Sequence, residues 1–191
     1  SASLQIVTND QGNTGSGGAL SDDDTVTINV NAVNDTPVHT VPGAQSTNED
    51  AALTFSSSNG NLISVADSDV ASSSMQVTLT STNGTSTLSG TSGLTFSSGD
   101  GSADASMVFT GTVSNVNSAL DGMSFSPTAN FNGSGSVQIV TSDQGNTGSG
   151  GALSDDDTVT ITISAVNDTP VHTVPGTQST NEDAALTFSS G

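Results

Sequence analysis

The sequence repeats itself over a long distance. Residues 5–57 reappear as residues 138–190, at a fixed offset of 133 positions. Units of solenoid proteins run about 20 to 50 residues, so a repeat this long predicts a tandem array of whole domains. We therefore expect the chain to be one segment of a longer array of such domains. Only five pairs differ between the copies: Asn9 and Ser142, Asn29 and Thr162, Val30 and Ile163, Asn31 and Ser164, and Ala44 and Thr177.

The repeat also sets the expected domain boundaries. One complete unit is expected over residues 38–170, after the C-terminal part of a preceding unit over residues 1–37. Residues 171–191 are then the N-terminal part of the following unit. A unit of 133 residues has the ordinary size of a single domain and can bury a core of its own.

The charge balance is extreme. Nineteen Asp and Glu residues face no Lys or Arg, which gives a formal charge of -19. Without basic groups the chain has no footprint for nucleic acid or for an anionic membrane surface. Two carboxylates about 4 Å apart repel by about 4 kcal/mol at an effective dielectric constant near 20. Any cluster of these acids therefore needs a counter-ion, and Ca²⁺ prefers such oxygen ligands.

Other residue classes exclude further options. The chain has no Cys, so disulfides and thiolate metal sites are excluded. No stretch approaches the roughly 20 apolar residues of a membrane span, so we expect no membrane insertion. Only 31% of residues are hydrophobic and 3% aromatic, but they fall in short alternating runs, which favours an ordered β-structure over disorder.

Short alternating runs recur along the unit. Met75, Val77 and Leu79 alternate with polar residues, and 159–163 alternates branched apolar residues with Thr, as strands do. Asn83-Gly84 predicts a hairpin turn, and the spacing in 113–120 predicts one short helix. The Gly-rich segment 144–157 lacks the Lys of a phosphate-binding loop and is interpreted as a flexible hairpin connection. Seven or so such strands predict an all-β fold, a β-sandwich.

Several strings in this sequence resemble a known family. AVNDTPV at both ends of the unit, NEDAALTF, VADSD, FSPTANFNGSGS and TSDQGNTGSGGALSDDD are similar to the cadherin-like tandem repeats of giant secreted bacterial adhesins. The resemblance covers the whole unit. It implies a Greek-key β-sandwich of cadherin or immunoglobulin type, an extracellular place on a bacterial cell surface, and Ca²⁺ bound at the junctions between units.

The resemblance also implies the calcium ligands. The junction with the preceding unit would take Asn34 and Asp35 from the linker, Asp67 and Asp69, and Asp143. The junction with the following unit would take Glu49, Asp50, Asn167 and Asp168, with Glu182 and Asp183 as the copies of Glu49 and Asp50 in the next unit. Cadherins proper carry an Asp-Arg-Glu segment near the second junction, whereas Asp121 stands here without the Arg or the Glu. The second junction is therefore expected to hold fewer ions or to bind them more weakly.

Each acidic group also has a purely structural interpretation. The linker Asp residues suit turns, and Glu49 with Asp50 suits a charged strand edge that discourages mispairing. The triplets 22–24 and 155–157 are interpreted as solvated hairpin acids rather than as ligands. For His39 and His172 an exposed or edge-packed side chain is favoured over a metal ligand.

Three functions follow in order of preference. The first is a structural extender, in which calcium-clamped sandwiches form a stiff extracellular rod whose partners are the neighbouring repeats. The second is a self-assembling filament or sheath, in which like chains pack laterally. The third is a carbohydrate-binding or cell-binding module, which the absence of Trp and Tyr disfavours. No catalytic arrangement of His, Ser and Asp stands out, so an enzyme is not expected.

Overall fold

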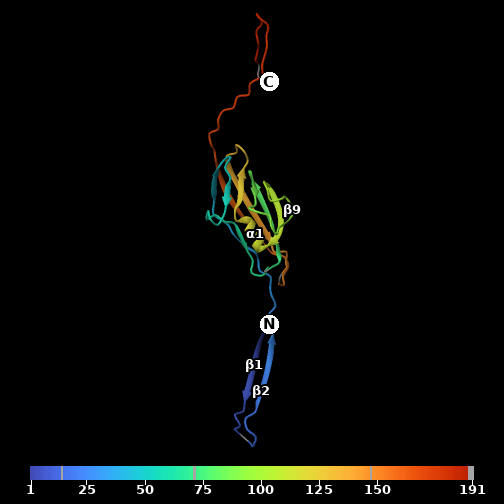
Figure 1. Cartoon of the computed structure of the whole chain (residues 1–191). Helices are drawn as coiled ribbons and strands as arrows, with labels where there is room; N and C mark the ends of the chain where they lie inside the picture. Colours follow the sequence, from blue (N-terminus) through green and yellow to red (C-terminus); the bar gives the residue numbers. More distant parts are fainter. Residues whose placement is uncertain (14, 71, 147, 189–191) are drawn as a thin grey trace.

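The computed structural model describes residues 1–13, 15–70, 72–146 and 148–188. A two-stranded hairpin stands at the N-terminal end, a β-sandwich follows, and an extended segment leaves the sandwich at the opposite end (Figure 1). The last three residues of the expected following unit, 189–191, lie outside the described residues. In the described part of the chain, no helix combines the length and the apolar character needed to cross a membrane.

The sandwich is built from one large sheet and two small ones. The large sheet has the strand order β4-β13-β12-β7-β10-β9, the facing sheet has the order β5-β11-β8, and β3 pairs with β6. All pairings are antiparallel except that of β13 with β4. The strands of the large sheet are β4 (Gln45–Asn48), β7 (Ser74–Thr82), β9 (Thr95–Ser98), β10 (Ser106–Thr112), β12 (Gly133–Ser142) and β13 (Ser154–Ser164). The others are β3 (Val38–Thr40), β5 (Leu53–Phe55), β6 (Ser64–Ala66), β8 (Gly84–Thr87) and β11 (Met123–Pro127).

The alternating runs place apolar side chains on one face of each strand, as predicted. In β7 the residues Met75, Val77 and Leu79 are buried, while Gln76 between them is exposed. The buried side chains of the two layers form one core, which includes Phe55, Phe109 and Phe125. The predicted all-β sandwich is confirmed, and the Greek-key connectivity stays a prediction.

The predicted short helix is also confirmed. Helix α1 (Val113–Leu120) begins after Thr112, whose side chain accepts a hydrogen bond of 3.3 Å from the backbone N–H of Asn115. This N-cap satisfies one of the free N–H groups of the first turn. The helix buries Val116, Ala119 and Leu120 against the core, which is the face that the spacing indicated.

The prediction that Asn83-Gly84 closes a hairpin is wrong, because this turn connects the two layers of the sandwich. Asn83 has the expected positive φ of 57°, but the strand that follows, β8, pairs with β11 in the facing sheet. The turn therefore carries the chain from one layer to the other. The hydroxyl groups of Ser81 and Ser86, 2.7 Å apart in the interior, bridge this corner.

Two segments of the chain are copies of parts of the sandwich. The hairpin of β1 (Ala2–Asn9) and β2 (Ser21–Ile28) has the same register as β12 and β13, with Ala2 opposite Ile28 as Gly135 is opposite Ile161. Its apolar face, which includes Ile6 and Ile28, is exposed. Residues 171–188 copy the segment that contains β3, β4 and β5, yet the described residues there form no strand.

Candidate metal site at the domain junction

The linker between the hairpin and the sandwich is held by the Gly-rich loop that joins β12 to β13. The backbone N–H of Ser149 donates to the carbonyl of Ala32 (3.0 Å), and that of Asn34 donates to the carbonyl of Ser149 (3.1 Å). The Asn34 side chain also donates to the carbonyl of Gly151 (2.8 Å). A Cβ on Gly148 would lie 2.5 Å from the backbone N of Asn34, so the contact requires glycine there. The sequence suggested a free connection, whereas this loop packs against the linker.

Asp143 lies at the centre of this contact and is fully buried. One carboxylate oxygen accepts from the backbone N–H groups of Gly145 (2.8 Å) and Leu153 (2.9 Å). The other accepts from the side-chain amide of Asn34 (2.6 Å). Burial raises the pKa of Asp143, but these hydrogen bonds outweigh burial and hold the pKa below its ordinary value. Asp143 is therefore a carboxylate at neutral pH.

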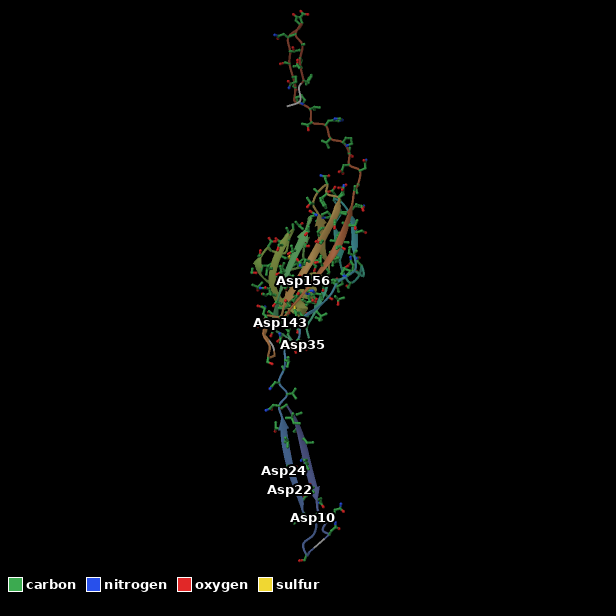
Figure 2. All side chains as sticks on the ribbon, turned by 180° about the vertical axis from the view of Figure 1, so that it is seen from behind. Asp10, Asp22, Asp24, Asp35, Asp143 and Asp156 are labelled. Carbon is green, nitrogen blue, oxygen red and sulfur yellow. The ribbon has the colours of Figure 1, made fainter. Side chains whose placement is uncertain are left out.

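A second group of acids comes from the turn after β6. The carboxylate of Asp67 accepts from the backbone N–H groups of Asp69 (2.9 Å) and Val70 (3.1 Å). Asp69 in turn accepts from the backbone N–H of Asp35 (2.5 Å), and Ser68 donates to the Asp35 carboxylate (2.9 Å). Asp35 and Asp143 lie at the same end of the sandwich, where the linker enters (Figure 2). Three separate segments, namely the linker, the turn after β6 and the end of β12, thus bring Asn34, Asp35, Asp67, Asp69 and Asp143 to this end.

Two oxygens in this group are buried without a hydrogen-bond partner among the described residues: Oδ1 of Asn34 and Oδ2 of Asp67. A buried oxygen that accepts nothing is unfavourable unless a cation or a donor satisfies it. The residues present fit a calcium ion, because Ca²⁺ takes carboxylate and amide oxygens. No three of these carboxylates, as described, converge within 4.8 Å of one another, in keeping with their mutual repulsion.

The opposite end of the sandwich gathers fewer of the predicted residues. Glu49 is buried and accepts from the backbone N–H of Val166 (2.6 Å), one residue before Asn167. Asp50, in the left-handed region at φ 62°, accepts from the backbone N–H of Asn130 (3.2 Å). The other predicted ligands of this end, Asn167 and Asp168 in the following linker, are exposed. Glu182 and Asp183, predicted as the next unit's copies of Glu49 and Asp50, are exposed in the C-terminal segment. The expectation that Asp121 lies near this end is wrong: it follows α1, which begins where β10 and β7 reach the Asp143 end of the sandwich. Its carboxylate accepts from the backbone N–H (3.0 Å) and the hydroxyl (2.8 Å) of Ser57.

One cluster was not predicted. The side chain of His39 is completely buried and faces Asp155 and Asp157. We expected an exposed or edge-packed side chain for both histidines, and only His172 is exposed. The spacing of Asp155 and Asp157 places both on one face of β13, and this was a usable signal. The approach of β3 to that face was not visible in the sequence.

Comparisons with known proteins add little to this geometry. The chain matches no protein-family model, and no curated protein matches it. Among solved structures, a surface layer protein (SbsC, domains 1–6) is similar at 13% identity and a TM-score of 0.27, over 86% of this chain and 20% of that one. A likeness at this level carries no argument about fold or function.

Proposed function

We propose that this chain is an extender repeat of a long extracellular bacterial surface adhesin, made rigid by Ca²⁺ at its domain junctions. The observation that carries the proposal is the gathering of acidic and amide oxygens from three segments where the linker enters the sandwich. Two of those oxygens, on Asn34 and Asp67, are buried and have no hydrogen-bond partner in the described part of the chain. The chain has no Lys or Arg to neutralise them.

The linker contact supports a mechanical role. The Gly-rich loop holds residues 32–34 through backbone hydrogen bonds, and Asp143 of the sandwich accepts from Asn34 of the linker. A cation at this place would add ligands from both sides of the junction, Asp35 on the linker and Asp67 on the sandwich. The junction would then resist bending, because bending would separate groups that share one ion.

The energy available is moderate. Extracellular calcium modules have dissociation constants of about 10⁻⁴ to 10⁻³ M. At a free calcium concentration of about 100 times the dissociation constant, binding stabilises the folded state by about 2.7 kcal/mol per site. Without the ion the carboxylates repel one another, so we expect the junction to loosen and the array to behave as a flexible chain.

The test is a calcium titration of the chain by calorimetry, with thermal melting and small-angle scattering in calcium and in chelator. We expect calcium to raise the melting temperature, and Asp67→Asn to remove most of this rise. The asparagine keeps the oxygen that accepts from Asp69 and Val70, so the turn survives. Asp23→Asn removes the same charge from the exposed hairpin, where Asp23 contacts Gln5, and should leave the rise unchanged.

Two outcomes would count against the proposal. Equal melting temperatures in calcium and chelator would mean that the acids are only a solvated surface. Equal calcium responses of Asp67→Asn and the unaltered chain would remove the junction site. Electron micrographs of a multi-repeat array would separate the rod from the filament, because single rods support the extender role and lateral bundles contradict it.

A further inference from the structure

We propose that His39, Asp155 and Asp157, named here the His39 site, bind a divalent transition-metal ion of the zinc class. None of these residues belongs to the calcium ligands described above. The three residues come from β3 and β13, and their ligand atoms lie within 4.8 Å of one another. Among the described residues this is the one group of three His, Asp or Glu side chains that converges so closely.

The imidazole of His39 is both buried and unsatisfied. Its side chain is 0% exposed, and its Nδ1 atom has no hydrogen-bond partner among the described residues. Nδ1 points between the two acids and lies 3.4 Å from an oxygen of Asp155 and 3.4 Å from an oxygen of Asp157. A buried Nδ1 that faces two carboxylates needs either an N–H directed at them or a metal ion between the three groups.

The spacing suits a small tetrahedral ion. Zinc lies about 2.0 to 2.2 Å from imidazole nitrogen and carboxylate oxygen. Two such ligands at a tetrahedral angle are about 3.4 Å apart, which is the separation of Nδ1 from each carboxylate oxygen. Three protein ligands leave one position for water. The nitrogen ligand also separates this site from the calcium site, because Ca²⁺ takes oxygen ligands and imidazole suits zinc and its neighbours.

The surroundings hold the ligands in position. The Nε2 atom of His39 lies 2.7 Å from the hydroxyl of Thr141, which is itself fully buried on β12. When Nε2–H donates to that hydroxyl, Nδ1 keeps a free lone pair, and a partner of this kind commonly orients a metal-binding histidine. The backbone N–H of His39 donates to Asp155 (2.8 Å). Asp156, on the other face of β13, contacts Gln138 instead.

The repeat supplies matched controls within the same chain. His172 is the copy of His39 and is exposed, while Asp24 is the copy of Asp157 in the bare hairpin. If any histidine or any Asp triplet bound the metal adventitiously, these copies would bind it as well. If the assembled geometry is needed, only the residues of the His39 site matter.

The experiment titrates zinc chloride into the whole chain in a calorimeter, after saturation with calcium, and follows the ring signals of both histidines by NMR. We expect one saturable zinc site and a shift of the His39 signals alone. His39→Gln and Asp157→Asn should abolish the saturable heat, whereas His172→Gln and Asp24→Asn should retain it. The Asp157 side chain is 40% exposed, so Asp157→Asn should fold even if His39→Gln does not.

Three results would overturn the proposal. The first is zinc binding by His39→Gln that equals binding by the unaltered chain. The second is zinc heat without movement of the His39 ring signals. The third is an absence of zinc binding at millimolar concentration, which would mean that no metal ion lies between His39 and the two acids. Calcium binding at the junction is measured in the first step, so failure of one site is distinguishable from failure of the other.

Discussion

Replacing Gly148 with alanine tests whether the loop between β12 and β13 holds the linker. The new methyl group would lie 2.5 Å from the backbone N of Asn34 and 2.7 Å from the carbonyl carbon of Val33. Both distances are well inside van der Waals contact, and both neighbours are backbone atoms that cannot rotate away. Either the linker or the loop must therefore move.

The two ways of relieving the clash have similar costs. Overpacking of this kind costs about 1 to 3 kcal/mol. If the loop retreats instead, it loses the two backbone hydrogen bonds between Ser149 and the linker, each worth about 0.5 to 1.5 kcal/mol. Alanine at φ +76° adds about 1 to 2 kcal/mol of left-handed strain. The same strain is expected at Gly151, where φ is +85° and nothing lies within 4 Å of an added Cβ.

The comparison is therefore between Gly148→Ala and Gly151→Ala. The chain has no Trp or Tyr, so urea unfolding is best followed by far-ultraviolet circular dichroism. We expect Gly148→Ala to lower the free energy of unfolding by about 1 to 3 kcal/mol more than Gly151→Ala. Equal losses in the two variants would refute the close contact between loop and linker.

Two further predictions use the repeat as a control. Ile139→Ala should lower the free energy of unfolding, measured by urea titration, by about 2 to 5 kcal/mol, because Ile139 is fully buried. Ile6→Ala, at the exposed copy of this position, should change the free energy of unfolding by no more than about 0.5 kcal/mol. The pKa of Asp143 is lowered in the folded state from the ordinary 3.8, so its stabilisation is present above that value and lost as pH falls through the folded pKa. Melting in chelator should therefore show a drop at acid pH that Asp143→Asn reduces. Asp23→Asn, in the exposed copy of the hairpin, should leave this drop unchanged.

Much of the fold could be predicted from the sequence because the relevant patterns involve residues close together in the chain. The alternation of Met75, Val77 and Leu79 indicates which face of β7 is apolar. The spacing of Val116 and Leu120 indicates which face of α1 is buried. These periodicities depend only on the geometry of strand and helix. The acids of the junction were identified through the resemblance to cadherin-like repeats and not through periodicity.

Contacts between segments that are distant in the chain could not be predicted from the sequence in this way. Nothing near Asn83 indicates that β8 joins β11 rather than β7. Nothing near Gly148 indicates that its loop contacts residues more than 100 positions earlier. The burial of His39 against Asp155 is of the same kind. In each case the deciding partner is remote in the chain, and packing chooses among segments with similar local patterns.

The repeat separates these two kinds of information within one molecule. The copies β1–β2 and β12–β13 form the same hairpin in the same register, because their hydrogen bonds join neighbouring segments that both copies contain. Burial differs, since only β12 and β13 have the rest of the sandwich against them. The segment 38–55 forms β3, β4 and β5 by pairing with β6, β13 and β11, while its copy over 171–188 forms no strand among the described residues. The sequence by itself determined the strand patterning, the register of the hairpin and the number of acidic residues. The tertiary structure decided which copies form strands, which side chains are buried in the core and which acids lie close together. These outcomes depend on the tertiary structure because they require partners that are distant in the chain.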